Sequence, residues 1–424
     1  MPSPFSTDPA LALELDRADP LARFRAEFVI ADPELIYLDG NSLGRMPERA
    51  AARIHHLLEQ EWGEGLVRSW GQSWFTSPSR IGGKIGRLIG AREDEVLLAD
   101  STSVNLFKLV IAALRAQGSR KTIVSDEFNF PSDLYVLQGA ADMLGQGHRL
   151  ALARSLDSIR MPAQQIVRQI NSDTALVALT HVAFKSGYLY EMQAVTEAAH
   201  AAGALMLWDL SHSVGAVPLD LNRCGVDLAV GCTYKYLNGG PGAPAFLYVR
   251  RDLQAELLSP IWGWFGRLRP FEFNLDYQPQ PDLRRFLAGT PPVLSTAAVE
   301  VGVDLTLEAG MDRIREKSVR QTDYLFYLTE ELLKPLGFSV GSPREAARRG
   351  SHISLRHPDA LRIDQAMIHD VKVIPDFRSP DNIRLGIAPL YTSFAEIREA
   401  VARIERVVTE RLYEKYSAEA PDVT

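Results

Sequence analysis

Residues 207–248 read LWDLSHSVGAVPLDLNRCGVDLAVGCTYKYLNGGPGAPAFLY and hold two charged residues in apolar surroundings. Asp209 ends the apolar run 204–208, and Lys235 lies between two tyrosines, shortly after the apolar run 228–232. Short apolar runs bounded by polar turns predict buried strands. Charged side chains are rarely buried unless they are paired or functional, so both positions indicate chemistry.

The two residues suit complementary tasks in one kind of active site. A nucleophilic lysine needs its neutral form favoured by partial burial or a nearby cation, and the end of an apolar strand provides burial. A carboxylate at the end of another strand can keep a heterocyclic nitrogen protonated. Lys235 and Asp209 therefore predict a pyridoxal 5′-phosphate (PLP) site, with a Schiff-base lysine and an acidic partner for the pyridinium nitrogen. The alternative is an exposed loop lysine and a helix N-cap, which either residue alone would fit.

Further polar residues follow apolar runs elsewhere in the chain. The cluster 100–105, DSTSVN, precedes the apolar helical run 106–114, where hydroxyls, free backbone N–H groups and the helix dipole can bind phosphate. An ordinary Ser/Thr N-cap is the alternative. Phe130 and Asp133 follow the strand predicted over 121–125, and they are candidates for stacking on the cofactor ring and for contact with the ring or phosphate region. Thr180 follows the strand predicted over 175–179, and its hydroxyl is a candidate for the cofactor's phenolic oxygen.

The order of strand, polar turn and helix recurs along the chain, and the strands lack apolar–polar alternation. This pattern predicts a mostly parallel sheet covered by helices on both faces. Ligands of such sheets bind beyond the carboxyl ends of the strands. We therefore expect one edge of the sheet to gather the residues that follow the apolar runs, namely Thr102, Phe130, Thr180, Asp209 and Lys235.

The composition narrows the class of partner. The chain has 424 residues, of which 46% are hydrophobic, and a net charge of −7, with no Lys/Arg stripe. Nucleic acid and anionic membranes are therefore not expected as main partners, and small molecules are. No apolar run approaches the roughly 18 residues that span a bilayer, and the first residues do not read as a secretion signal, so we expect the cytoplasm. Cys224 and Cys232 have no metal-ligand spacing, and neither a disulfide framework nor a metal site is predicted.

A set of short motifs follows in a fixed order over nearly the whole chain. They are LDGNSLG (38–44), STSVNL (101–106), FPSD (130–133), LSHSVGAVPLDL (210–221), YKYLNGGPG (234–242), GWFG (263–266), AGTPP (288–292) and RLGIAPLY (384–391). With this set the chain resembles the kynureninase family, PLP enzymes of fold type I, the aspartate aminotransferase fold. The resemblance implies an α/β protein with a mostly parallel seven-stranded sheet in a large domain and a smaller α/β domain.

The resemblance also implies roles for individual residues. The lysine of YKYLN carries PLP in the family, which implies Lys235, with Asp209 on the pyridine nitrogen. Tyr234 is implied to bond the cofactor phosphate, and we consider it an acid/base candidate because the phosphate can relay a proton. Further cofactor contacts implied by the motifs are Thr102, Ser103, Phe130, Asp133, Thr180 and His212.

The remaining implied roles concern the substrate and a second subunit. Arg384 matches the arginine that pairs with the substrate α-carboxylate, a role that suits guanidinium geometry. Asn41 is implied to lie near the substrate. Trp264 and Thr290 reach the phosphate region of the neighbouring subunit in the family, which implies a homodimer with sites completed across the interface.

The activity implied by the resemblance is hydrolytic cleavage of the Cβ–Cγ bond of L-kynurenine, or of 3-hydroxykynurenine, in tryptophan catabolism. The products are anthranilate, or 3-hydroxyanthranilate, and L-alanine. The sequence leaves the preferred substrate open, with His55, His56, Trp74 and Phe75 as candidates for that choice.

Two alternatives remain. A class V PLP enzyme such as a cysteine desulfurase or lyase needs a later nucleophilic cysteine, and none follows Cys232. A non-catalytic PLP-binding protein would have no use for Arg384 and Tyr234.

Three segments are predicted from the order of elements. Residues 1–60 form an N-terminal segment that joins the small domain, residues 61–300 the large PLP-binding domain, and residues 301–424 the C-terminal small α/β domain. Apolar residues at helical spacing predict one amphipathic helix over residues 10–28.

Overall fold

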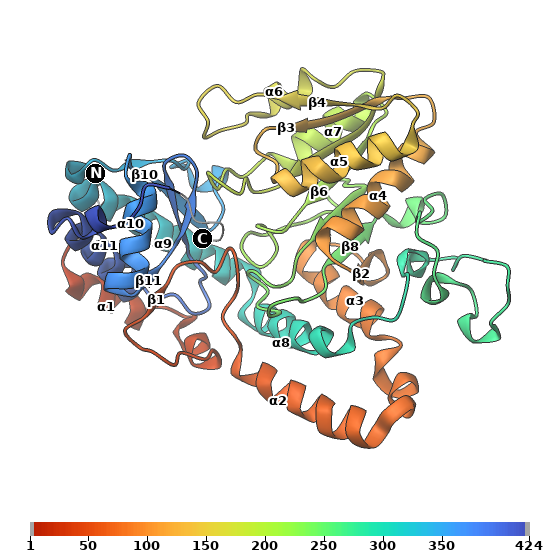
Figure 1. Ribbon diagram of the computed structural model, residues 1–424, viewed down its shortest axis with the longest axis horizontal. Coiled ribbons are helices and arrows are strands. Elements are labelled where there is room, and N and C mark those ends of the chain that lie inside the picture. The colour runs from red at the N-terminus through yellow and green to blue at the C-terminus, as the bar shows by residue number, and fades with distance from the viewer. Residues whose placement is uncertain (1–3, 420–424) are drawn as a thin grey trace.

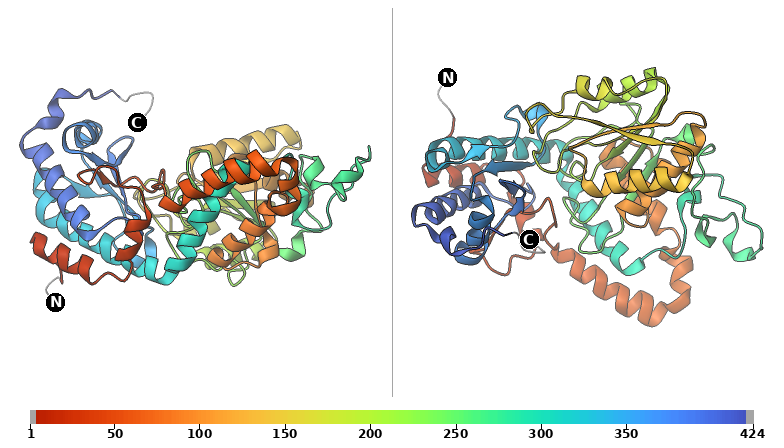
Figure 2. Two further views of the ribbon diagram at one scale, coloured as in Figure 1. Left: turned by 90° about the horizontal axis from the view of Figure 1, so that it is seen from below. Right: turned by 45° about the horizontal axis from the view of Figure 1, so that its top comes forward.

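The computed structural model describes residues 4–419, which form a larger and a smaller body (Figures 1 and 2). The larger body is built on a seven-stranded sheet of order β2-β8-β7-β6-β5-β3-β4. Neighbouring strands are parallel except at β8, which is antiparallel to β2 and β7. The predicted fold class is thereby confirmed. The strands are β2 (Val96–Leu98), β3 (Thr122–Asp126), β4 (Arg149–Ala153), β5 (Thr174–Thr180), β6 (Leu205–Asp209), β7 (Leu228–Gly231) and β8 (Phe246–Val249).

Helices cover both faces of this sheet. Along β5, Val177 and Leu179 pack into one hydrophobic core, and Leu176 and Ala178 pack into another on the opposite face. Successive side chains of a strand point to opposite faces, so a strand covered on both sides must be apolar throughout. The first face carries α3 (Ser77–Ile89), α6 (Ala163–Val167), α7 (Met192–Ala201) and α8 (Val293–Ala309), and the second carries α4 (Thr102–Ala116) and α5 (Pro131–Leu144).

The smaller body combines the C-terminal part of the chain with N-terminal residues. Its antiparallel sheet has the order β12-β13-β10-β9, and β1 pairs in parallel with β11 beside it. Ile36 and Leu38 are buried in its core. The strands are β1 (Ile36–Tyr37), β9 (Ser339–Val340), β10 (His352–Arg356), β11 (Val373–Ile374), β12 (Asp376–Arg378) and β13 (Asn382–Gly386), and the helices are α1 (Pro9–Arg17), α9 (Met311–Leu328), α10 (Ala360–Val371) and α11 (Phe394–Thr409).

Two connections join the bodies. Helix α2 (Glu48–His56) continues as a π-helical stretch, Leu57–Gly65, and packs against α8. Gly310, at φ +82°, separates α8 in the larger body from α9 in the smaller one (Figure 1). No helix within residues 4–419 is long and apolar enough to cross a membrane.

The single helix predicted over residues 10–28 is wrong. Helix α1 ends at Arg17, and a separate 3-10 helix covers Ala22–Glu27. Pro20 lies between them, and the residue before a proline is disfavoured in the helical conformation. The Asp19 carboxylate accepts from the backbone N–H of Leu21 at 2.9 Å and lies 2.6 Å from the Lys317 ammonium, which stabilises the break.

Candidate active site

A cavity of 240 Å³ lies at the carboxyl ends of the sheet strands, against the smaller body. Strands β5 and β6 end in the cavity residues Thr180 and Asp209, and β7 leads into Lys235. Its walls also include β13 and the turn after β1. The lining residues are Asn41, Ser42, Thr102, Ser103, Phe130, Ser132, Asp133, Thr180, Phe184, Asp209, Ser211, His212, Tyr234, Lys235, Arg378 and Arg384.

Lys235 is held by a tight loop between β7 and β8. The N–H of Asn238 donates to the carbonyl of Lys235 at 2.9 Å, and the Thr233 hydroxyl donates to the carbonyl of Pro244 at 2.7 Å. The N–H of Gly44, from the turn after β1, donates to the carbonyl of Tyr234 at 2.8 Å. A Cβ at Gly44 would collide with the carbonyl of Lys235, so the close approach requires glycine. The loop and the turn together aim the ammonium of Lys235 into the cavity.

A pair of buried carboxylates lies near Lys235. Asp209 accepts hydrogen bonds from the backbone N–H of Ser211 at 2.9 Å and from its hydroxyl at 2.6 Å. Burial raises the pKa of Asp209, and at Asp133, from α5, burial and the charge of Asp209 both raise the pKa. Two neighbouring acids in a buried site are stabilised by a cation. A protonated ring nitrogen satisfies this requirement, so the pair fits the pyridinium end of PLP.

Hydroxyl groups line the cavity at the start of α4 and α5. Ser101 caps α4, and the hydroxyl oxygens of Ser103 and Ser132 lie 3.1 Å apart. Ser132 belongs to the first turn of α5, so two helix N-termini meet here. Free backbone N–H groups and helix dipoles at such ends attract anions, and this end fits a phosphate.

An ion pair with a buried ammonium lies at the start of α4. The fully buried ammonium of Lys108 lies 2.6 Å from a carboxylate oxygen of Asp100 and 2.7 Å from the carbonyl of Phe286. Asp100 adopts a φ of +43°, in the left-handed region, directly before the capping serine. The ion pair therefore fixes the backbone at the point where the chain turns into α4.

Phe130 and Thr180 also line the cavity. Phe130 is 44% exposed, and the ring of Phe184 meets its ring edge-on at 5.4 Å. Thr180 donates its hydroxyl hydrogen to the carbonyl of Val182 at 3.1 Å, which leaves the hydroxyl oxygen as an acceptor. The exposed face of Phe130 suits a flat ring.

The smaller body supplies the polar groups on the remaining side. Arg384 is 2% exposed, and its Nε donates to Asp376 at 2.6 Å. Asn41 is fully buried, yet neither its amide nitrogen nor its amide oxygen has a partner within residues 4–419. Buried amides are normally satisfied, so Asn41 is available to a ligand in the cavity.

Two predicted residues lie outside this cavity. Trp264 packs edge-on against Phe265 at 4.5 Å, in the segment 258–277, and Thr290 is exposed. The candidates for substrate choice, His55, His56, Trp74 and Phe75, do not line the cavity either.

Five cavity residues were not singled out from the sequence. Three of them lie inside quoted motifs, beside residues that were named, and Arg378 and Phe184 lie outside any motif. The five are Ser42, Ser132, Phe184, Ser211 and Arg378.

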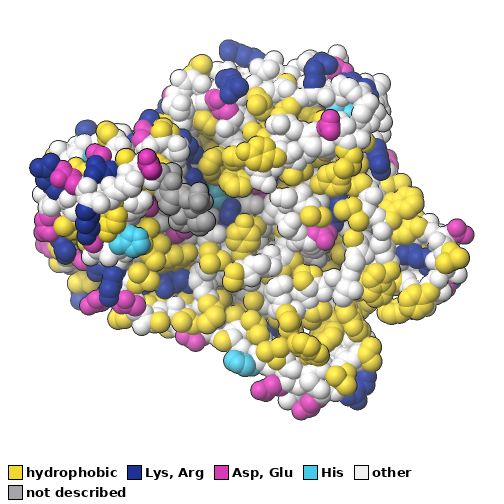
Figure 3. Space-filling model, viewed as in Figure 1, with side chains coloured by type: hydrophobic (Ala, Val, Ile, Leu, Met, Phe, Trp, Pro, Cys, Tyr) yellow, Lys and Arg dark blue, Asp and Glu magenta, His cyan; other side chains and the backbone are white. Residues whose placement is uncertain are grey.

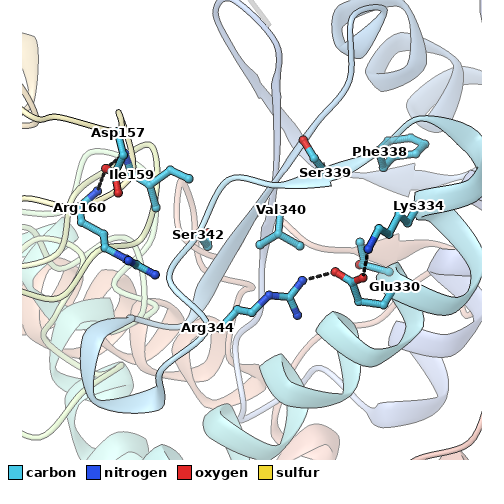
Figure 4. Close-up of a pocket in the computed structure, with 11 residues that line it drawn as sticks. Asp157, Ile159, Arg160, Glu330, Lys334, Phe338, Ser339, Val340, Ser342 and Arg344 are labelled. Carbon is cyan, nitrogen blue, oxygen red and sulfur yellow. Dashed lines mark hydrogen bonds and ion pairs between the residues drawn. The ribbon is translucent and has the colours of Figure 1, made fainter.

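A larger cavity, of 380 Å³, lies between the loop 157–160 and the smaller body (Figure 4). Its charged side chains bind one another: Glu330 accepts from Lys334 at 2.8 Å and also pairs with Arg344. It contains no buried acid and no lysine beside an acid pair. The smaller cavity is therefore the candidate for chemistry.

The fold and the cavity together define a PLP-dependent enzyme of fold type I. Solved structures of cysteine desulfurases share the fold. The enzyme from Thermococcus onnurineus NA1 superposes with a TM-score of 0.78 at 18% identity, covering 94% of this chain and 98% of that one. CsdA from Escherichia coli gives 0.78 at 14% identity, covering 92% and 98%.

Sequence relatives identify the family. The family model of the kynureninase C-terminal domain matches residues 314–404. Kynureninase of Pseudomonas fluorescens is 44% identical over 406 residues, 95% of each chain, and that of Burkholderia mallei is 44% identical over 402 residues, 94% of each. The chain belongs to the kynureninase family, so the resemblance predicted from the motifs is confirmed.

Proposed function

We propose that this protein hydrolyses the Cβ–Cγ bond of L-kynurenine, and of its 3-hydroxy derivative, to give anthranilate or 3-hydroxyanthranilate and L-alanine. Lys235 is the residue that binds PLP covalently. The observation that carries the proposal is the position of Lys235 near the buried acids Asp209 and Asp133, in a cavity that Arg384 also lines. Family membership at 44% identity supports the same reaction.

When bound, PLP withdraws electrons from the substrate carbons next to the amino group. Asp209 would keep the ring nitrogen protonated, with Asp133 as a second acid beside it. Thr102 and Ser103 would hold the phosphate, Phe130 would stack on the ring, and Thr180 would bind the phenolic oxygen. His212 lies beside Lys235 and completes the set of cofactor residues.

Two side chains are assigned to proton transfer. Lys235 would take the proton from the substrate Cα, because its amine faces the cavity. Burial raises the pKa of Tyr234, so its hydroxyl keeps its proton at neutral pH and acts as a donor near the phosphate. Arg384 binds the α-carboxylate, and Asn41 offers its unpartnered amide to the substrate.

The test combines chemical labelling with a fluorescence assay. After borohydride reduction, peptide mass spectrometry should find the PLP adduct on Lys235, and kynurenine should yield fluorescent anthranilate. Lys235→Ala should lose both, whereas Lys334→Ala, an ion-paired lysine in the other cavity, should lose neither. An adduct on another lysine, or no anthranilate from loaded wild-type protein, contradicts the proposal.

We propose further that the protein is a homodimer. Segment 258–275 projects from the larger body and carries large exposed apolar side chains, including Phe273 (72%) and Leu275 (103%). Figure 3 has hydrophobic side chains concentrated over the region where Figure 1 draws this segment. Exposed apolar patches of this kind mark interaction surfaces. Trp264 belongs to the segment, which supports its assignment, with Thr290, to the partner's site.

The domain division predicted from the sequence, 1–60 with the small domain, 61–300 as the large one and 301–424 as the rest of the small one, stays a proposal, with its second boundary moved to Gly310 because α8 packs in the larger body. Burial of Ile36 and Leu38 in the core of the smaller body supports the first assignment. The cytoplasm stays the predicted compartment.

A further inference from the structure

Two arginines of the small antiparallel sheet lie against one carboxylate. Asp376 binds Arg384 through Nε and Nη2, and its Oδ2 lies 2.7 Å from Nη2 of Arg378. Asp376 and Arg378 are two positions apart on β12, and Arg384 is the residue of β13 directly opposite Asp376. Residues in these positions project from the same face of a sheet. The sheet thus presents both guanidinium groups to one cavity.

The guanidinium group of Arg378 has N–H donors that are not used by its contacts within the protein. Its Nη1 donates to the carbonyl of Phe377 at 2.9 Å and its Nη2 pairs with Asp376, while 29% of the side chain is exposed. A guanidinium has five N–H donors, so Arg378 retains capacity for an anion. Arg384 is more fully engaged, because it also donates to the carbonyl of Phe184 and to the hydroxyl of Ser42.

The charges around the two arginines include more than Asp376. Two other acids face Arg378: Asp39, from the turn after β1, and Asp364, from α10. Burial, with the charge of Asp376, raises the pKa of each to about 7. Below about pH 7 both acids are mostly protonated, and the two guanidinium groups then face the charge of Asp376 alone. Both guanidinium groups line the cavity, and the substrate's only fixed negative charge is its α-carboxylate.

We propose that Arg378 is a second contact to the substrate α-carboxylate, beside Arg384, and that Asp376 is the positioning residue that orients both guanidinium groups. The inference rests on the proposed function, because it takes an α-amino acid as the ligand of this cavity. A carboxylate held between two guanidinium groups is fixed in orientation as well as bound, which aligns Cα with the reactive end of Lys235.

The competing explanation gives Arg378 a structural part only, as a counter-ion that keeps Asp376 in place. Binding of two small amines to the PLP-loaded enzyme separates the explanations: L-alanine has the carboxylate, and L-alaninamide has a neutral amide instead. Each is titrated by its change in the visible absorption of the cofactor, a readout that needs no turnover. Arg378→Gln should raise the Kd of L-alanine by about 10- to 100-fold, the range for a hydrogen bond to a charged group. The Kd of L-alaninamide should change less than about twofold.

Conservative and control variants complete the test. Arg378→Lys keeps the charge and should recover part of the affinity for L-alanine. Arg356→Gln, on β10, removes an arginine paired with Asp381 outside the cavity and should leave both constants unchanged. The proposal is overturned if Arg378→Gln loses affinity for L-alanine and L-alaninamide equally, or loses affinity for neither.

Failure of the proposed function is distinguishable from failure of this inference. If Arg378 is needed to discriminate L-alanine from its amide but the wild type releases no anthranilate from kynurenine, the proposed reaction is refuted and Arg378 is supported as a carboxylate contact. Wild-type protein that releases anthranilate while Arg378→Gln binds L-alanine normally refutes the second arginine alone.

Discussion

The Nζ atom of Lys235 lies 2.9 Å from Nε2 of His212, inside the buried end of the cavity. Burial and the nearby charge of Lys235 lower the pKa of His212, so the ring is neutral at physiological pH. A neutral ring that accepts from the lysine through Nε2 must carry its proton on Nδ1. His212 therefore orients the lysine amine without repelling it.

Replacing His212 tests this orientation. His212→Phe removes the acceptor and should lower kcat by about 10- to 100-fold, in line with the cost of unpairing a buried charged donor. The PLP adduct on Lys235 should persist after borohydride reduction. His212→Gln retains an acceptor, so its kcat should lie between the values of the wild type and of His212→Phe. Loss of the adduct in His212→Phe would mean that His212 serves attachment of PLP rather than orientation.

Lys108 should matter for cofactor affinity although it does not line the cavity. Lys108→Met removes the pair with Asp100 and leaves the carbonyl of Phe286 unpaired, so the turn that begins α4 loosens. We expect about a 10-fold weaker Kd for PLP, measured by fluorescence titration of the apoprotein, together with a lower Tm.

Lys121→Met is the matched control for Lys108, because the Lys121 ammonium donates to the surface carbonyl of Gly118. It should leave both quantities unchanged. A lower Tm with unaltered PLP affinity in Lys108→Met would restrict Lys108 to packing.

Asp364 should make stability depend on pH. Burial raises its pKa from the ordinary 3.8 to about 7, so the folded state holds the proton more tightly than the unfolded state does. The stability from this bound proton is complete at low pH and is lost as the pH rises through about 7. Asp364→Asn removes the titrating group. The Tm of the variant minus that of the wild type should therefore grow between about pH 5 and about pH 8.5.

Thermal melts of the apoprotein at the two pH values measure this gain. Asp142→Asn, an exposed acid on α5, is the control and should show no such growth. A gain from Asp364→Asn that is equal at both values would show that the side chain does not titrate in this range.

The projecting segment 258–275 should carry the subunit contact. Replacing Phe273 and Leu275 by serine removes two of its most exposed apolar side chains and should shift a dimer toward monomer in sedimentation velocity. Activity should fall with the shift and recover at higher protein concentration, because Trp264 and Thr290 are assigned to the partner's site. A wild-type protein that sediments as a monomer while active would refute the dimer.

The cofactor end of the cavity follows from local patterns in the sequence. Thr180, Asp209 and Lys235 each follow an apolar run, and parallel strands bring such positions to one edge whatever the loop lengths. Phe130 obeys the same rule, since β3 ends at Asp126 and α5 begins at Pro131.

The substrate end depends on long-range packing that no local pattern encodes. Ser42 donates to Asp376 at 2.9 Å across 334 positions of the chain, and β12 has only three residues and no periodicity. No local pattern therefore indicates Arg378, and only a family motif indicates Arg384. The roles proposed for Trp264 and Thr290 depend on a second subunit, which lies beyond any pattern in one chain.

The turn after β1 contacts strands β12 and β13 through Ser42, and this contact between distant parts of the chain has a consequence for biosynthesis. Ribosomes release the N-terminal part of a chain first, and domains generally fold as they emerge. Residues 96–249, which contain the whole seven-stranded sheet, leave the ribosome well before Asp376 and Arg384. During that interval the nascent protein has the residues proposed to bind the cofactor but lacks the arginines proposed to bind the substrate. The turn that contains Asn41 and Ser42 is synthesised early, but it can form a wall of the cavity only after β12 and β13 have been synthesised.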